Sequence, residues 1–112
     1  MVGVDKHLPW RRPAGVPLRT PVHPGRFLDR QFLKPLHLSQ AQAARALGVS
    51  RRRLNEIVVG RRGLSADTAL RCAMTFGLEA TFWLDLQSRW DSYHAWKAWR
   101  AAAPSRDCGV AL

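Results

Sequence analysis

Residues 39–60 have the sequence SQAQAARALGVSRRRLNEIVVG, and the order of residue types in this stretch predicts two helices joined by a short turn. Ser39 and Gln42 are spaced as the pair that forms a capping box at a helix start. Gly48 follows the first run of helical residues, and a glycine in that position commonly ends a helix. Ser50 is a favourable N-cap for the second helix, which we expect to continue to the end of the stretch.

The geometry expected of this pair is that of a helix-turn-helix. Two helices that cross steeply through a tight turn need a small residue in the first helix and a turn residue that tolerates left-handed geometry. Ala44 and Gly48 meet these two needs. The inner face of the second helix is expected to pack through four apolar residues: Val49, Leu54, Ile57 and Val58.

The opposite face of the second helix carries side chains that can recognise DNA. Arginine can bond guanine bidentately in the major groove, and asparagine can pair with adenine. We therefore predict base contacts for the residues of this face: Ser50, Arg51, Arg52, Asn55 and Glu56. Between Ala44 and Arg62 there are six arginines and one acid, Glu56. The alternative interpretation is an ordinary helical hairpin with a solvated basic face.

Outside this stretch, the same signals predict three further helices and hence an all-α fold of five helices. Apolar residues at helical spacing predict a helix over 24–34, with a stripe formed by Phe27, Leu28, Phe32 and Leu36. Ser65 opens another helix, which Gly77 closes, and the longest helix is expected over about 81–103. No segment alternates for long enough to be a strand.

This organisation indicates one DNA-binding domain over residues 23–103, followed by a short tail over 104–112. The preceding residues 1–22 contain four prolines, and their basic residues outnumber the single Asp5. Prolines remove backbone donors and unbalanced charge opposes collapse, so we expect a disordered or loosely docked basic arm.

Composition narrows the class of partner. The chain has 112 residues, of which 46% are apolar, so one core is expected. The formal net charge of +10 predicts salt-dependent binding to polyanions.

No apolar run is long enough to span a membrane, and prolines interrupt the N-terminal residues where a signal region would lie. Two cysteines do not make a disulfide framework, so we expect a reduced, cytoplasmic protein.

The sequence predicts neither a metal site nor an enzyme. The four histidines lie far apart, and none is spaced with a cysteine as metal ligands are. His23, before Pro24, is expected in the turn that begins a helix, and Cys72 is expected to be buried. No phosphate-binding glycine loop and no catalytic pair is present, so no cofactor is expected.

The last predicted helix carries a stripe of large side chains: Trp83, Leu86, Trp90, Tyr93 and Trp96, with Trp99 beside it. We expect Trp83 and Leu86 to pack on the core. From Trp90 onward the helix is expected to extend past so small a core, which favours an interface with a second copy or with another protein. We therefore predict a two-fold dimer joined through Trp90, Trp96 and Trp99.

The first predicted helix carries a basic stripe at helical spacing, formed by Arg26, Arg30 and Lys34. Two interpretations stay open for it. The stripe either contacts phosphate and widens the electrostatic footprint of the protein, or it is a solvated face that contacts nothing.

Five segments together carry a resemblance to a known family. They are HPG at 23–25, FLKPLHLSQ at 32–40, ALGVSRRRL at 46–54, GRRGLSADTALR at 60–71 and FWLDLQ at 82–87. With these segments the chain resembles the HigA family of antitoxins, which have a phage-repressor-like helix-turn-helix fold, over Val22 to about Trp99. The helix-turn-helix alone is unspecific, but its combination with HPG and FWLDLQ at these spacings is specific.

The resemblance implies a homodimer that binds an inverted-repeat operator, represses its own operon and neutralises a small ribonuclease toxin of the RelE-like type. By position, Gln40 and Arg61–Arg62 would hold phosphates, and the face beginning at Ser50 would contact bases. We add Arg53 to the predicted phosphate contacts.

Two other functions remain open at this stage. One is a solitary repressor-like regulator without a toxin, and the other is a protein-interaction or RNA-binding module that reuses the fold. If a toxin binds, the candidate surfaces are the arm around Leu8–Trp10 and the end of the last helix around Trp96–Trp99. The arm is a candidate because a basic segment with a lone Trp10 has no core to join and can become ordered on binding.

Overall fold

The computed structural model of the protein describes residues 11–110, with side chains described for residues 11–102. The described residues are helical or irregular and include no strand, so the all-α prediction is confirmed. The elements in chain order are α1 (Pro24–Leu28), the π-helical turn η1 (Asp29–Leu33), α2 (Gln40–Leu47), α3 (Arg51–Val58), α4 (Ala66–Phe76) and α5 (Ala80–Val110).

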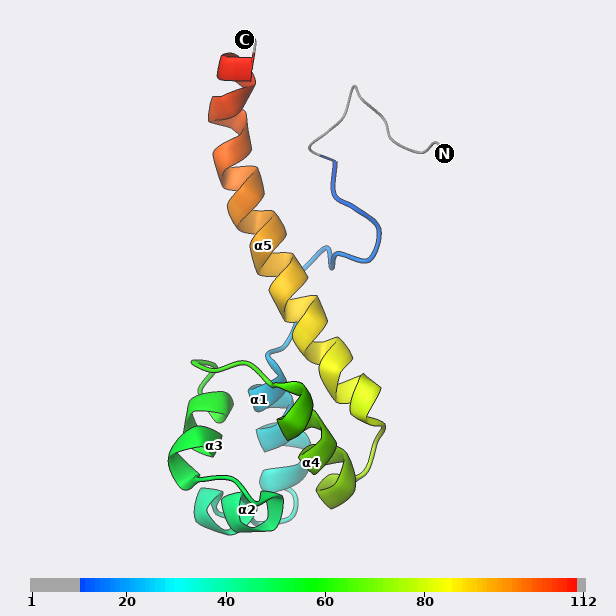
Figure 1. Ribbon diagram of the computed structural model, residues 1–112, viewed down its shortest axis with the longest axis vertical. Helices are drawn as coiled ribbons and strands as arrows, with labels where there is room; N and C mark the ends of the chain where they lie inside the picture. Colours follow the sequence, from blue (N-terminus) through cyan, green and yellow to red (C-terminus); the bar gives the residue numbers. More distant parts are fainter. Residues whose placement is uncertain (1–10, 111–112) are drawn as a thin grey trace.

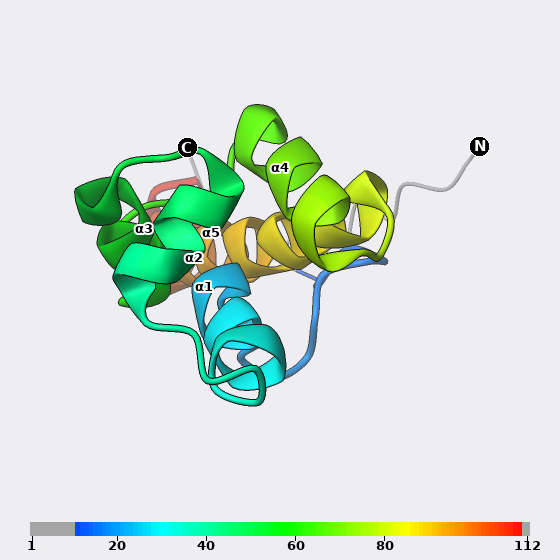
Figure 2. The same cartoon turned by 90° about the horizontal axis from the view of Figure 1, so that it is seen from below.

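The helices form a cluster at one end of the molecule. We call α1 to α4, together with the first turns of α5, the helical cluster; the rest of α5 extends away from it (Figure 1). Viewed along the long axis, the start of α5 lies between α1 and α4 (Figure 2). No helix within residues 11–110 combines the length and apolar character needed to cross a bilayer.

The three predicted N-caps are present. The Ser39 hydroxyl accepts a hydrogen bond from the Gln42 amide at 3.1 Å, and the Ser39 amide donates to the Gln42 side chain at 2.8 Å. Ser50 caps α3 by accepting from the Arg53 amide, and Ser65 caps α4 in the same way. These bonds pair amides that a helix start leaves without partners, and this fixes where each helix begins.

The turn between α2 and α3 follows the prediction closely. Gly48 has φ +76°, the left-handed region that a residue without a Cβ adopts at little cost. Its amide donates to the Ala44 carbonyl, and so does the amide of Val49. Ala44 itself is buried, as expected where α3 must approach α2 closely.

The core is centred on Trp83 at the start of α5. Its side chain is fully buried, and its indole N–H donates to the Gly77 carbonyl at 3.1 Å. Phe27 and Phe32 each lie with their ring centroids 5.6 Å from Trp83. The remaining buried side chains come from every helix of the cluster: Leu28, Leu33, Ala43, Ala44, Leu47, Leu54, Ile57, Leu64, Ala69 and Cys72. Burial raises the pKa of the Cys72 thiol to about 12, so this cysteine is an unreactive core residue.

The first helix differs from the prediction of a regular helix over 24–34. After Leu28 it becomes π-helical, and the Lys34 amide donates to the Asp29 carbonyl at 2.9 Å. Leu28 and Leu33 are both buried, and one π-helical turn brings residues five apart to the same side. The predicted stripe is wrong at Leu36, which is 57% exposed, because the helical residues end at Leu33 and Leu36 lies in the turn that follows.

The last helix is longer than the expected 81–103. Residues 104–110, expected as a tail, continue α5 as helix. The sequence pattern placed the end before Pro104, since proline lacks the backbone donor that a helix interior uses. In the structure, α5 continues through Pro104, with helical turns before and after it.

Residues 11–22 are irregular and run beside α5 toward α1 (Figure 1). A hydrogen bond from the Thr20 hydroxyl to the Tyr93 hydroxyl, at 2.9 Å, joins them to α5. Leu8–Trp10, the candidate toxin contact in the arm, lies outside the described residues.

Candidate nucleic-acid interface

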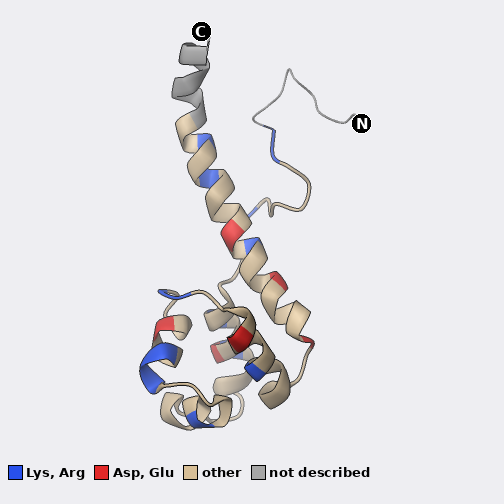
Figure 3. Ribbon diagram, viewed as in Figure 1, with Lys and Arg blue, Asp and Glu red and all other residues tan. Residues whose placement is uncertain are grey.

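The face of α3 that points away from the core carries the predicted base-contacting residues. Leu54 and Ile57 are buried, whereas Arg51, Arg52 and Asn55 are exposed. The basic residues of α3 and those of the loop after it lie on the same side of the helical cluster (Figure 3). An exposed, arginine-rich helix face that is fixed from behind by apolar side chains can enter a major groove.

The start of α2 lies against this face. The Asn55 side-chain amide donates to the Gln40 side-chain oxygen at 3.0 Å. Asn55 was predicted to contact a base and Gln40 to hold a phosphate, and the structure brings these two residues together. Their contact places a residue predicted to bind the DNA backbone beside one predicted to contact a base, as an interface that follows the groove requires.

The loop after α3 folds back onto the helix through Glu56. The amides of Arg61 and Arg62 both donate to the Glu56 carbonyl, at 2.8 and 3.1 Å. The Arg62 guanidinium donates to the Glu56 carboxylate at 2.9 Å, and the Arg52 guanidinium lies 3.5 Å from the same carboxylate. The hydrogen bond from Arg62, with the charges of Arg62 and Arg52, lowers the pKa of the Glu56 carboxyl. Glu56 is therefore ionised at neutral pH and positions two of the predicted DNA-contacting arginines.

Two other arginines of the set are unpaired within the described part of the chain. The guanidinium groups of Arg51 and Arg61 are exposed, and neither makes a hydrogen bond or ion pair to another described residue. These two side chains can bind an external anion without first breaking an internal contact.

Arg53 is placed differently from the rest of the predicted set. It is half-buried, and its guanidinium donates to the Thr68 hydroxyl at 3.2 Å and to the Ser65 hydroxyl at 3.4 Å. Its Nε atom is buried without a partner among the described residues. Arg53 thus joins α3 to the start of α4, with only part of its guanidinium available to a phosphate.

Two positioning contacts were not predicted from the sequence. Arg71, from α4, donates to the carbonyls of Leu47 and Gly48 at 3.2 Å each, and so holds the turn of the helix-turn-helix. Gln87, from α5, accepts from the Leu64 amide at 2.7 Å and holds the loop after α3. Both residues lie within the quoted family segments, but nothing in their local sequence indicates which backbone groups they reach.

His23 confirms the expected helix start and connects it to α5. Its Nδ1 atom accepts from the Gly25 amide at 3.0 Å, which caps α1. The ring packs edge-on against Trp90 with centroids 5.0 Å apart. Burial is the main cause that lowers the pKa of His23, and the charge of Asp91 acts in the opposite direction. No cluster of metal-ligating side chains occurs within the residues described.

The aromatic stripe of α5 divides into three environments. Trp83 is fully buried, and Leu86 packs half-buried on the core, as predicted. Trp90 is not the surplus apolar surface that we expected, because it packs between His23 and His94. Trp96 is also half-buried, beside the arm, while Trp99 is 47% exposed. His23 and the arm lie outside α5, so helical periodicity could not indicate their contacts with Trp90 and Trp96, whereas His94 lies four residues from Trp90 on the same helix.

The basic stripe of the first helix is exposed at all three positions, Arg26, Arg30 and Lys34. Lys34 lies 3.4 Å from the Asp29 carboxylate, an exposed pair of little energetic weight. The contact of this stripe with phosphate stays a prediction.

Comparison with known proteins agrees with this geometry. The helix-turn-helix family model matches residues 30–83. Virulence-associated protein I of Dichelobacter nodosus is 47% identical over 79 residues, which cover 70% of this chain and 73% of that protein. Antitoxin HigA-1 of Vibrio cholerae is 32% identical over 77 residues, which cover 66% and 72% of the two chains. The Pseudomonas aeruginosa antitoxin HigA, solved with the higBA promoter, superposes with a TM-score of 0.68 at 44% identity, and the match covers 70% of this chain and 85% of that one.

Proposed function

The chain belongs to the HigA family of helix-turn-helix antitoxins, and from this premise we propose that it binds the operator of its own operon and represses it. The observation that carries the proposal is the exposed α3 face, with Gln40 and Arg61–Arg62 at its borders. The complex of the related Pseudomonas antitoxin with a promoter supports the same mode of action here. The proposed activity is binding without catalysis, and it would take place on DNA in the cytoplasm.

The proposed DNA contacts fall into two groups. Base contacts are assigned to Ser50, Arg51, Arg52, Asn55 and Glu56 on the exposed face of α3. Phosphate contacts are assigned to Gln40, Arg53, Arg61 and Arg62 at its borders. Phosphate contacts set the register and most of the affinity, whereas base contacts set the sequence preference.

A homodimer is proposed because α3 has only eight residues and contacts too few base pairs for useful specificity. Two copies would place their recognition helices roughly 34 Å apart on an inverted repeat. Since Trp90 is occupied within the chain, we place the contact at four exposed apolar residues, which follow one another at every fourth position around the α4–α5 corner: Leu70, Met74, Leu78 and Phe82.

The dimer contact has a direct test. Met74 is 78% exposed, so Met74→Glu should leave the fold intact and give a monomer in sedimentation. The double variant Trp96→Ala, Trp99→Ala should stay dimeric. A monomer from the second variant and a dimer from the first would move the interface to the distal end of α5.

Operator binding is tested by titrating a duplex that spans the region upstream of the chain's own gene. The expected result is salt-dependent binding with a preference over unrelated duplexes of the same length. Equal affinity for all duplexes would contradict sequence-specific repression.

Toxin neutralisation is the second part of the proposal. We expect a small ribonuclease encoded beside this gene to bind the chain and lose its toxicity. Co-expression of the two proteins should then restore growth, and they should purify together. The charge of +10 favours the alternative, a solitary regulator, because ribonucleases that grip RNA are themselves basic. Failure of both rescue and co-purification would establish that alternative.

A further inference from the structure

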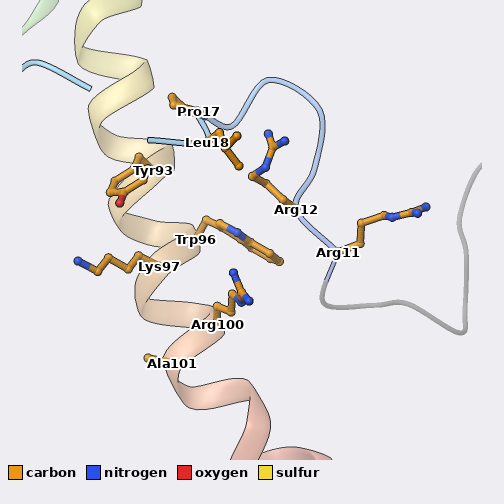
Figure 4. A pocket seen from close by; sticks show the side chains of 9 residues that line it. All are labelled: Arg11, Arg12, Pro17, Leu18, Tyr93, Trp96, Lys97, Arg100 and Ala101. Atoms are coloured by element: carbon orange, nitrogen blue, oxygen red, sulfur yellow. The ribbon is translucent and has the colours of Figure 1, made fainter. Parts of the chain in front are cut away.

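A pocket of about 560 Å³ lies between the arm and the distal part of α5, away from the α3 face. Arg11, Arg12, Pro17 and Leu18 of the arm form its outer wall, and α5 supplies its inner wall from Tyr93 to Ala101. Figure 4 shows the Trp96 side chain extending from α5 toward the arm, with Arg12 and Leu18 opposite it and Arg100 one turn further along. None of these residues belongs to the proposed DNA interface.

The outer wall is shaped by contacts within the chain. The Val16 amide donates to the Pro13 carbonyl at 3.3 Å, closing a turn in which Gly15 has φ +90°. The Arg12 guanidinium donates to the Val16 carbonyl. Below the turn, the bond from Thr20 to Tyr93 fixes the arm to α5. Contacts within the chain therefore hold the outer wall in place beside α5.

The lining combines one sign of charge with apolar surface. Its cations are Arg11, Arg12, Lys97 and Arg100, and no acidic residue lines it. Lys97 and Arg11 project outward at the rim, whereas the Trp96 ring and the Leu18 side chain face the space between the walls (Figure 4). Leu18 remains 75% exposed, so apolar surface beside Arg12 and Arg100 is uncovered.

We propose that this pocket binds an acidic segment of a partner protein, which inserts one large apolar side chain between Leu18 and Trp96 and places carboxylates on Arg12 and Arg100. Arginine binds carboxylates through paired, charge-assisted hydrogen bonds, and an apolar side chain between Leu18 and Trp96 would cover surface now in contact with water.

Two other occupants fit less well. A second copy of this chain carries the same charge of +10, which opposes its approach to these cations, whereas the proposed dimer contact uses four uncharged apolar residues. A single-stranded nucleic acid would bring phosphates to the cations and could stack one base on the Trp96 ring, but the opposite wall, formed by Leu18 and Pro17, is aliphatic and offers no second stacking surface. An acidic peptide with an apolar residue satisfies both parts of the lining.

The position of the pocket allows DNA and the partner to bind together. Trp96 lies about 20 Å along α5 from Trp83, which is buried in the core of the helical cluster. The pocket therefore lies outside the cluster that carries the α3 face. The proposal thus goes beyond the proposed function, and it holds whether or not the chain represses an operon.

The test measures binding of a short fluorescein-labelled peptide in which one leucine is flanked on both sides by aspartates and glutamates. Full-length protein should bind it, and replacing the peptide's leucine by serine should weaken binding about tenfold. Trp96→Ala, and separately the double variant Arg12→Glu, Arg100→Glu, should each lower the affinity by about tenfold or more. Circular dichroism establishes that each variant remains helical.

The matched control is the double variant Arg51→Glu, Arg52→Glu, which changes the net charge equally but on α3. Peptide binding should survive in this control. Loss of binding in the control with retention in the pocket variants would overturn the proposal, since the peptide would then be a polyanion on the DNA interface. Absence of binding by the unaltered protein, or equal binding of the leucine and serine peptides, would also overturn it. Two further results would overturn the proposal. One is a single-stranded oligonucleotide that binds as tightly as the peptide and whose binding is lost in Trp96→Ala. The other is a change of the Trp96→Ala variant from dimer to monomer.

Discussion

The two ends of α5 place the same residue type in opposite environments. Trp83 at the base is fully buried, with Phe27 and Phe32 against it, while Trp99 near the other end is 47% exposed. Both tryptophans belong to one continuous helix, but they are 16 residues apart and therefore point to nearly opposite sides of it. The difference shows that a residue of this helix becomes core only where its side of the helix faces the helical cluster, as that of Trp83 does, and otherwise remains exposed.

The largest expected effect is a difference in the loss of stability between substitutions at the two ends of α5. Trp83→Ala should lower the free energy of unfolding by about 3–5 kcal/mol, because it leaves a cavity among packed aromatic rings. Trp99→Ala should lower it by less than about 1 kcal/mol. Urea unfolding followed by circular dichroism measures both, and Trp83→Phe serves if the alanine variant does not fold. Similar losses at the two positions would break the comparison.

The next effect is a difference in DNA affinity between substitutions in the helical cluster and substitutions in the distal part of α5. Arg51→Ala should cost about 1–3 kcal/mol at one operator position, because an unpaired arginine on α3 loses a base contact. Arg100→Ala, at the distal end, should leave operator affinity and sequence preference unchanged. Titrations against operators altered at single positions would check this, and a loss of affinity with Arg100→Ala would bring the distal helix into the DNA interface.

Within the helical cluster, a substitution of Arg61 tests which residues contact phosphate and which contact bases. Arg61→Ala should weaken binding to all sequences and reduce the salt slope by about one unit, as expected for a phosphate contact. The readout is affinity as a function of salt, for both operator and unrelated duplexes. Loss of sequence preference from this variant alone would contradict the assignment of Arg61 to phosphate.

A smaller effect is expected at Glu56, the acid that pairs arginines in the cluster and has no counterpart in the lining of the α5 pocket. Glu56→Gln removes the charge that holds Arg52 and Arg62. Affinity for unrelated duplexes should rise, with the salt slope steeper by about one unit. A fall in affinity for every duplex would contradict this expectation, because it would show that the positioning of Arg52 and Arg62 by Glu56 matters more for binding than the repulsion between its charge and the phosphates.

The smallest effect is a pH dependence at His23, where the cluster meets α5. Burial lowers the pKa of His23 below 6.5, so the unfolded chain binds the proton more readily than the folded one. Stability should therefore fall as the pH drops from about 6.5 toward the lowered pKa, and it should be regained as the pH rises. Urea midpoints measured across this range, with His23→Asn as a control that keeps a cap acceptor, test the effect. An equally steep dependence in the control would assign the titration to another group.

Much of the helical cluster could be predicted because its signals are local. The caps at Ser39, Ser50 and Ser65 each bond an amide three residues on, and Gly48 adopts a conformation set by its own lack of a Cβ. The apolar period of α3 indicated its buried face for the same reason. Such interactions lie within one helical turn, so they are determined before any tertiary contact forms.

The sequence by itself thus determined the all-α class, the helix-turn-helix between Ser39 and Gly60, and an exposed arginine face on its second helix. Only the tertiary structure decided that Arg53 joins α4, that Gln87 and Arg71 hold the loops of the interface, and that Trp96 lines a cationic pocket with Arg12. The physical reason is the distance along the chain between the residues in contact. Each of these contacts joins residues from different turns or different elements, and their partners depend on how the helices pack rather than on the spacing of residues along any one of them.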